Sequence, residues 1–348
     1  MLSRRTVAGL LALASLSPAR LAAQAATPLS RIAFGSCADQ TQPQPIWESI
    51  LAWRPDLFIF AGDNVYGDFN TADAAKLKRA YEAAAGIEGY TRLRASVPHL
   101  AIWDDHDYGL NDGGVEFPHK AAAKEEFLKF WKVPAGDARR TRDGLYTAQT
   151  FGPPGRSVQI ILLDTRWFRS PLKPTDQRGA AGKQRYLPDP DPAKTMLGEV
   201  QWAWLAGELR KPAELRLIVS TTQVLAEGHG WERWGNLPLE RQKMFDTIRT
   251  SGARGVIFLS GDRHIGALYR ETPPGLYPLV DLTSSGLNKV YAAAKEPGPN
   301  RIGDLLAREN FGTIEVDWPQ RRLTLALRGL TGDVERAVAI DFTTIGIA

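Results

Sequence analysis

The chain alternates short apolar runs typical of strands with amphipathic runs typical of helices, from residue 31 to residue 259. The strand-like runs cover 31–34, 56–61, 99–103, 158–163, 215–221 and 256–259. The helix-like runs lie between them, at 46–53, 72–85, 121–131, 199–210 and 239–249. This order predicts an α/β fold in which helices connect parallel strands.

The last part of the chain changes pattern. Strand-like runs at 277–282, 313–317, 322–327 and 338–342 follow one another without long helices, which predicts antiparallel pairing. No repeat or long linker divides the 348 residues, so we predict one folded domain over 26–348. A proline-rich stretch at 168–195 predicts a long surface excursion, and excursions of that length are often functional.

Residues 1–25 have the features of an export signal peptide. They combine basic residues and no acid with an apolar run from Val7 to Leu16, and we expect cleavage after Ala25. The apolar run is too short for a stable membrane anchor. The pair Arg4-Arg5 favours a twin-arginine (Tat) signal, which implies the twin-arginine export machinery as a partner and a periplasmic or secreted location.

Composition argues against a nucleic-acid partner. The chain has 43 Lys and Arg against 39 Asp and Glu, a formal net charge of +4, and most of this excess lies in residues 1–25. The remainder is nearly neutral, so it has no compositional signature of nucleic-acid binding. The single cysteine, Cys37, excludes an internal disulfide, and its polar neighbours favour a functional thiol over a buried apolar one.

Polar side chains follow the ends of six predicted strands. In an open α/β sheet the carboxyl ends of parallel strands share one edge, where ligands bind. The sequence therefore predicts one crevice that receives a thiol, carboxylates, a phenol, imidazoles and guanidinium groups. The segments concerned are 35–37, 62–68, 103–107, 164–166, 222–223 and 261–264.

So many acidic groups in one crevice need compensating positive charge, because buried carboxylates repel one another. Metal ions supply that charge most compactly. Asp63 and Tyr66 are three residues apart after a strand, and Asp262 and His264 are two apart in extended chain, so both pairs have spacings suited to chelation. An isolated Gly-Asp step is usually a turn. Its recurrence at successive strand ends favours a metal site.

In this order the motifs resemble those of the PhoD-like alkaline phosphatases, a branch of the calcineurin-like metallophosphoesterases. The resemblance implies a four-layer α/β/β/α sandwich with two facing mixed sheets, and activity as a phosphoric monoester hydrolase. It covers most of the mature chain. The motifs are Gly-Ser-Cys (35–37), Gly-Asp-x-x-Tyr-x-Asp (62–68), Trp-Asp-Asp-His-Asp (103–107), Leu-Asp-Thr-Arg (163–166) and Gly-Asp-Arg-His (261–264).

The resemblance also implies a binuclear centre of ferric iron and calcium, with zinc or another divalent ion as the alternative. A thiolate and a phenolate are electron-donating ligands that suit ferric iron, whereas calcium takes oxygen ligands. We therefore expect four side chains to hold the iron: Cys37, Asp63, Tyr66 and His264.

The second, harder ion would share Asp63 with the iron. Asp262 would also face it, together with either Asp105 or Asn111. The wider superfamily has an Asn-His pair where this chain has Asp105-His106, so the identity of the ligand stays open. Gln223 falls where the superfamily commonly has another histidine ligand, and it could supply an oxygen.

The mechanism follows from charge. A phosphate ester bound across two cations would be attacked in line by a metal-bound hydroxide. We expect His106 to protonate the leaving oxygen and Arg166 to clamp the phosphate, although a salt bridge from Arg166 to Asp164 is an equally good interpretation.

Three other functions remain open on the sequence. A phosphodiesterase or phospholipase would use the same centre. A non-catalytic protein would bind phosphate without turnover. A thiol enzyme would use Cys37 with His106, but it would leave the other candidate ligands without a role.

Two long segments follow strands that end at the crevice: the excursion at 168–195 and the loop at 228–234. We expect both to form a rim that contacts the alcohol part of the ester, or else to be anchored by packing of their aromatic residues. The rim residues expected are Trp167, Arg169, Trp231 and Arg233.

Overall fold

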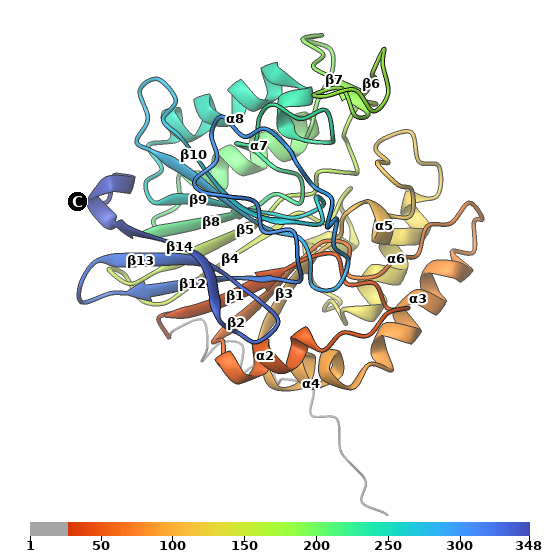
Figure 1. Cartoon of the computed structure of the whole chain (residues 1–348), viewed down its shortest axis with the longest axis horizontal. Coiled ribbons are helices and arrows are strands. Elements are labelled where there is room, and N and C mark those ends of the chain that lie inside the picture. The colour runs from red at the N-terminus through yellow and green to blue at the C-terminus, as the bar shows by residue number, and fades with distance from the viewer. Residues whose placement is uncertain (1–26) are drawn as a thin grey trace, which may run out of the picture.

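The structure is a computed structural model in which residues 27–348 are described (Figure 1). The predicted export signal at 1–25 lies outside these residues. No helix of residues 27–348 is long and apolar enough to cross a membrane.

The first of two six-stranded sheets combines parallel and antiparallel strands in the order β14–β13–β12–β1–β2–β3. Strands β1, β2 and β3 are parallel, and β1 also pairs antiparallel with β12, which begins the antiparallel run to β14. The bounds are β1 (Arg31–Gly35), β2 (Leu57–Ala61), β3 (His99–Ile102), β12 (Phe311–Asp317), β13 (Arg322–Arg328) and β14 (Val334–Asp341).

The second sheet has the order β10–β11–β9–β8–β5–β4. Its four central strands are parallel, and an antiparallel strand closes each edge. The bounds are β4 (Thr147–Phe151), β5 (Val158–Leu162), β8 (Leu215–Val219), β9 (Val256–Ser260), β10 (Gly266–Glu271) and β11 (Leu279–Ser284).

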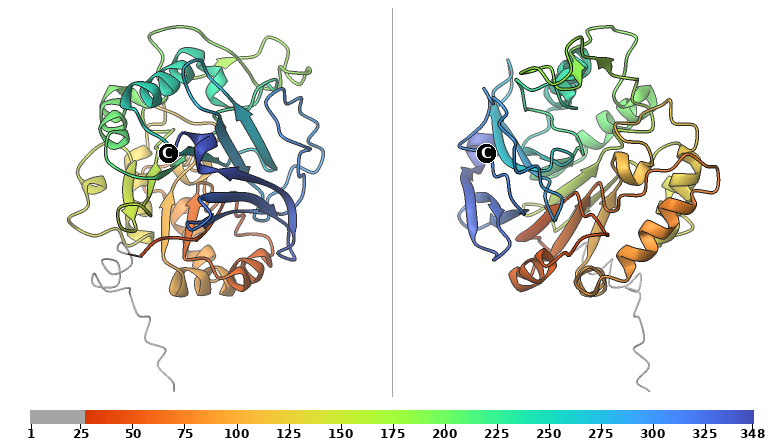
Figure 2. Two further views of the ribbon diagram at one scale, coloured as in Figure 1. Left: turned by 90° about the vertical axis from the view of Figure 1, so that its left-hand side faces the viewer. Right: turned by 45° about the vertical axis from the view of Figure 1, so that its right-hand side comes forward.

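The sheets face each other and helices cover both outer faces, which confirms the predicted four-layer sandwich (Figures 1 and 2). Along β8, Leu217 and Val219 join the core shared with the first sheet, whereas Ile218 between them packs with the helices on the other side. Both faces of β8 are buried, which explains why its sequence is apolar apart from Arg216. The first sheet is covered by α2 (Ile46–Trp53), α3 (Ala75–Ala85), α4 (Glu88–Ser96) and α6 (Lys120–Phe130), and the second by α7 (Gly198–Leu209) and α8 (Pro238–Ser251).

Several elements differ from the sequence prediction. The helix predicted from residue 72 begins at Ala75, because the Asp73 carboxylate accepts the Ala75 N–H at 3.2 Å. Helix α4 and the edge strands β4 and β10 were not predicted, since edge strands and polar helices lack a strong apolar period. The prediction of antiparallel pairing is correct for β12 to β14 but wrong for one side of β11, which lies parallel to β9.

The predicted excursion at 168–195 lies at the surface and holds a two-stranded sheet, β6 (Lys173–Pro174) with β7 (Tyr186–Leu187). Its base is closed by a hydrogen bond from Ser170 N to Thr195 O at 2.9 Å, and its tip is joined to the loop at 228–234 by bonds from Arg185 N and Tyr186 N to Gly230 O. Short helical turns complete the chain: α5 (Asp105–Tyr108), η1 (Ala138–Arg140), η2 (Trp234–Asn236) and η3 (Phe342–Ile345).

Candidate metal centre

The loops that leave β1, β2, β3 and β9 meet where the two sheets face each other. Gly62 has φ +92°, and a Cβ atom there would lie 2.5 Å from the Asp104 Cβ. A Cβ atom on Gly261 would lie 2.5 Å from the Ser36 Oγ. The glycine before each aspartate therefore permits loops of different strands to approach within contact distance.

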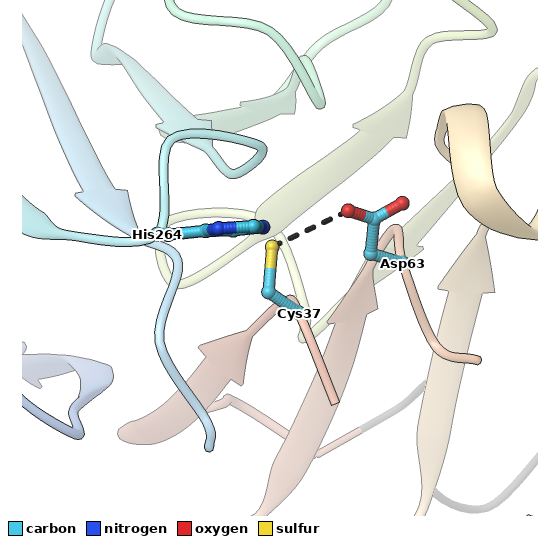
Figure 3. A group of neighbouring side chains, drawn as sticks. All are labelled: Cys37, Asp63 and His264. Carbon is cyan, nitrogen blue, oxygen red and sulfur yellow. Dashed lines mark hydrogen bonds between the residues drawn. The ribbon is translucent and has the colours of Figure 1, made fainter. Parts of the chain in front are cut away.

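One set of side chains, which we name the sulfur group, comprises Cys37, Asp63, Tyr66 and His264. Figure 3 shows the thiol of Cys37 between Asp63 and His264, and Sγ lies 3.4 Å from the Asp63 Oδ2. The Tyr66 hydroxyl lies 3.0 Å from the His264 Nε2 and 3.4 Å from the Asp63 Oδ2. The structure thus brings together the four side chains that the sequence predicted as iron ligands.

A second set, which we name the acidic group, comprises Asp104, Asp105, Glu232 and Asp262. Ligand atoms of Asp104, Asp105 and Asp262 lie within 4.8 Å of one another. Asp63 connects this group to the first, because it also lies within that distance of Asp105 and His106. Both groups border one cavity of about 230 Å³.

Arg166 neutralises part of the acidic group from inside the protein. Its side chain is fully buried, its Nε lies 2.6 Å from the Asp104 Oδ1, and its Nη1 lies 2.7 Å from the Glu232 Oε2. Its Nη2 is 3.9 Å from the Asp105 Oδ1. One guanidinium therefore faces three carboxylates.

The backbone of the site is strained. Cys37, Asp63, Asp262 and His264 all have φ between 47° and 65°, a left-handed conformation that side chains other than glycine seldom adopt. Each such residue costs on the order of 1 kcal/mol, and residues of this kind cluster at functional sites. Four candidate ligands of the site therefore stand on backbone in this unfavourable conformation.

Burial disfavours ionisation throughout the sulfur group. It raises the pKa of the Cys37 thiol to about 12, against the opposing hydrogen bonds from Ser285 and Ser36. Burial, with the charges of Cys37 and Asp63, raises the pKa of Tyr66 well above its usual value. Burial and the charge of Asp105 do the same for Asp63. These groups need a cation among them to become anionic ligands.

The two histidines of the cavity differ in charge. Burial, followed by the charges of Arg263 and His106, lowers the pKa of His264 to about 4, which leaves a neutral imidazole suited to a metal. Burial also opposes the charged form of His106. The Asp105 carboxylate and a hydrogen bond from the His106 Nδ1 to the Asp68 Oδ2, 2.7 Å long, nevertheless raise the pKa of His106 to about 9. His106 is therefore a proton donor near neutral pH.

The sequence model of the PhoD-like phosphatases matches residues 32–279 of this chain. The chain belongs to the PhoD-like phosphatase family.

Two kinds of relative support this assignment. Alkaline phosphatase D of Bacillus subtilis is 21% identical over 284 residues, which are 68% of this chain and 46% of the relative, so the chain spans about half the length of that curated relative. A solved structure of PhoD superposes with a TM-score of 0.66 at 16% identity, covering 91% of this chain and 69% of that one. The purple acid phosphatase PPD1 from yellow lupin (Lupinus luteus) gives 0.59 at 12% identity, covering 92% and 55%. The structural likenesses show a shared fold.

The side chains present in this PhoD-like chain fit a pair of cations. Asp104 Oδ2 and Asp105 Oδ1 are buried without a hydrogen-bond partner, and the thiol and phenol of the sulfur group both lie beside one further carboxylate oxygen, the Asp63 Oδ2. Unsatisfied buried acceptors of this kind are expected where a cation belongs. The two positions differ in their donor atoms. The sulfur group offers sulfur, phenol, carboxylate and imidazole, whereas the acidic group offers carboxylates alone.

Two other predicted ligands have different surroundings. Asn111 lines the cavity with an exposed side chain. Gln223 is fully buried, and its amide bonds to the Tyr269 hydroxyl at 3.2 Å, the Thr283 hydroxyl at 2.9 Å and the His229 Nε2 at 3.1 Å. The structure therefore does not bring Gln223 to the cavity, and its amide stabilises the interior of the second sheet.

The sequence did not single out Glu232 or the role of Asp68. Glu232 is 2% exposed and is held between Arg166 and Arg169, from which its Oε1 is 3.2 Å distant. The sequence feature that could have pointed to Glu232 is its position as a charged residue between two tryptophans in the loop at 228–234. Among the four expected rim residues, Trp231 lines the cavity, whereas Trp167, Arg169 and Arg233 are buried in packing and ion-pair contacts away from it.

Proposed function

We propose that this protein is an exported metal-dependent phosphatase that hydrolyses phosphate monoesters, an alkaline phosphatase of the PhoD-like kind. The observation that carries the proposal is the sulfur group joined through Asp63 to the acidic group on the wall of one cavity. A thiol enzyme would need an activated Cys37, but burial raises the pKa of this thiol to about 12.

Two cations would occupy the site, with ferric iron at the sulfur group and calcium at the acidic group. When bound, they supply neutralisation of the phosphate oxygens and a lowered pKa for the attacking water. Asp63 would serve both cations, because its carboxylate lies within 4.8 Å of the ligand atoms of Cys37 and His264 and also of Asp105. Asp105 and Asp262 would hold the calcium, with Asn111 as a further oxygen donor from the cavity wall.

His106 would give its proton to the leaving alkoxide. Asp68 would act as a positioning residue, because it binds the Nδ1 of His106 and leaves Nε2 as the nitrogen free to face the substrate. The ring also packs against Tyr66 at an interplanar angle of 38°, with centroids 4.3 Å apart, which restricts its rotation. This arrangement matches the geometry required of a general acid.

Arg166 would act through the carboxylates that it contacts. Its three carboxylate neighbours and its full burial support a role in holding the acidic group in place. The phosphate clamp predicted from sequence stays a prediction for this residue.

Elemental analysis and visible absorption of the purified protein test the metals. Thiolate and phenolate bound to ferric iron should give a charge-transfer band, so we expect a tinted protein that contains iron and calcium. A colourless, active protein that holds only zinc would refute the iron assignment and leave the phosphatase assignment standing.

Rates on a monoester and a diester of the same phenol test the reaction. We expect the monoester to give the larger kcat/KM. A larger value for the diester would reassign the site to a phosphodiesterase, and binding of phosphate without turnover of either ester would make it a binding protein.

Export is tested by cell fractionation. We expect the full chain in the periplasm or medium, and Arg4→Lys with Arg5→Lys should retain it in the cytoplasm. Export of the double variant at an unchanged level would exclude the twin-arginine route.

A further inference from the structure

Two arginines lie against one tryptophan on the wall of the cavity. The Cζ atoms of Arg185 and Arg263 are 5.2 Å and 4.8 Å from the ring centroid of Trp231. All three residues line the same cavity as the two metal-binding groups. We name them the arginine wall.

The arginine wall is assembled from three separate segments. Arg185 comes from the excursion just before β7, Trp231 from the loop after β8, and Arg263 from the loop after β9. The Tyr291 ring meets Trp231 edge-on at 6.1 Å and supports it from a fourth segment. Cation–π contact with a shared indole holds two like charges close together, although they repel.

Both guanidinium groups keep free donors. Arg185 uses Nη1 to bind the Asp112 carboxylate, and Arg263 uses Nη2 to bind Glu296. The Arg263 Nε is buried without a hydrogen-bond partner, and its side chain is 7% exposed. Each guanidinium carries five N–H donors, so donors remain for a further anion.

The arginine wall borders the acidic group on the wall of the same cavity. Asp112 marks the boundary: its backbone N–H binds the Asp105 Oδ2 at 2.7 Å, while its carboxylate binds Arg185 and the Tyr186 hydroxyl. A phosphate over the metals and its alcohol part would share this cavity, so the alcohol part can reach the arginine wall. Arg166 cannot fill this role, because it is wholly buried among carboxylates.

We propose that the arginine wall binds a second acidic group on the substrate, so the preferred esters carry a carboxylate or another phosphate on the alcohol part. The inference rests on the proposed function, since the alcohol part is defined by an ester bound at the metals. Bidentate contact with guanidinium is the favoured geometry for either anion.

The test compares two esters that differ at one group, glycerate 3-phosphate and glycerol 3-phosphate. The first carries a carboxylate where the second carries a hydroxymethyl group. The native holoenzyme should prefer the glycerate ester by on the order of tenfold to a hundredfold in kcat/KM, mainly through KM, the range of a charged hydrogen bond. Arg185→Gln and Trp231→Leu should each reduce this ratio at least tenfold with iron and calcium content constant.

Lys183→Gln is the matched control. Lys183 stands in the same excursion, but it pairs with Asp176 at the surface, 2.8 Å away. It should leave the ratio unchanged. The arginine wall is refuted if the native protein shows no preference, if the preference survives in both test variants, or if the variants slow both esters equally, which would place the arginines on the scissile phosphate.

Calorimetric Kd values for the same two esters separate this inference from the proposed function. A protein that binds the glycerate ester more tightly through Arg185 yet hydrolyses neither ester would retain the arginine wall and refute the phosphatase. A protein that hydrolyses both esters without discriminating between them would retain the phosphatase and refute the arginine wall.

Discussion

The sulfur group and the acidic group border one cavity, yet they are neutralised in different ways. The acidic group has an internal cation, Arg166, within 2.7 Å of both Asp104 and Glu232. Within residues 27–348 the sulfur group forms no salt bridge, and Lys289 is 4.8 Å from the Tyr66 ring centroid. An internal cation therefore compensates part of the charge of the acidic group, whereas the sulfur group has no internal cation paired with it among the described residues.

The pKa values of Asp105 and Cys37 reflect this difference. Burial raises the pKa of Asp105 but the charges of His106 and Arg166 outweigh it, so the net pKa is lowered. Burial raises the pKa of Glu232 to only about 7, because Arg166 and Arg169 oppose it. Cys37, buried without such a partner, reaches about 12. Burial raises the pKa of Asp104 and of Asp262, so Asp105 is the member of the acidic group whose ionised form is favoured before any metal binds. The thiol and phenol of the sulfur group become anionic only with a metal.

Removing the residue that joins the groups should have the largest effect. Asp63→Ala takes a carboxylate from both groups, so we expect loss of stable metal binding and of all measurable activity. Elemental analysis and ester hydrolysis measure the two effects. Asp176→Ala, at the surface of the excursion, is the control and should change neither. Full metal content in Asp63→Ala would show that the groups bind independently.

His106 belongs to the cavity wall but to neither group. His106→Ala should retain both metals and lower kcat by about 10² to 10⁴-fold, the usual range for acid–base catalysis. Asp68→Asn should give a smaller loss and shift the alkaline limb of the pH–rate profile downward, because the neutral amide no longer favours the charged ring. An empty metal site in His106→Ala would instead make this residue a ligand.

Stability of the metal-free protein should separate the groups. Arg166→Met leaves buried carboxylates without their counter-charge and should lower the free energy of unfolding by about 3 to 5 kcal/mol. Cys37→Ala removes an uncharged thiol and should cost about 1 kcal/mol. Urea unfolding of chelator-treated protein measures both. Equal costs would contradict the view that only the acidic group depends on an internal cation.

His99 lies outside both groups and shows how burial affects the pKa of a histidine away from the metal centre. Burial lowers the pKa of His99 to about 4, against an unfolded value near 6.5. Below pH 6.5 the unfolded chain binds a proton at His99 that the folded chain does not bind. The free energy of unfolding therefore falls as the pH drops toward 4, by at most about 3 kcal/mol. His99→Leu should remove this contribution. The wild-type minus variant difference in unfolding free energy should therefore decrease between pH 7 and 4, and a constant difference would exclude it.

Local sequence determined most elements and the types of residue in the site. Runs such as 158–163 and 256–259 are long enough and apolar enough to specify buried strands without help. The strand-end motifs also predicted that the side chains of the sulfur group lie close together, as they do in the structure, since the carboxyl ends of parallel strands share an edge. Their role as metal ligands stays a prediction. Edge strand β4 and helix α4 were not predicted, because their sequences have no hydrophobic period that distinguishes them from loops.

Only the tertiary structure decided how charge is distributed among these residues. Arg166 and Glu232 are 66 positions apart and neither has a local partner that reveals the pairing. Gln223 follows a strand end as the motif order requires, yet the second sheet turns its amide toward Tyr269 and His229. The sequence specifies which chemical groups arrive at the edge of a sheet, because that depends on local periodicity. Which of them are neutralised by each other, and which need an ion, depends on burial and on distances between segments remote in the chain.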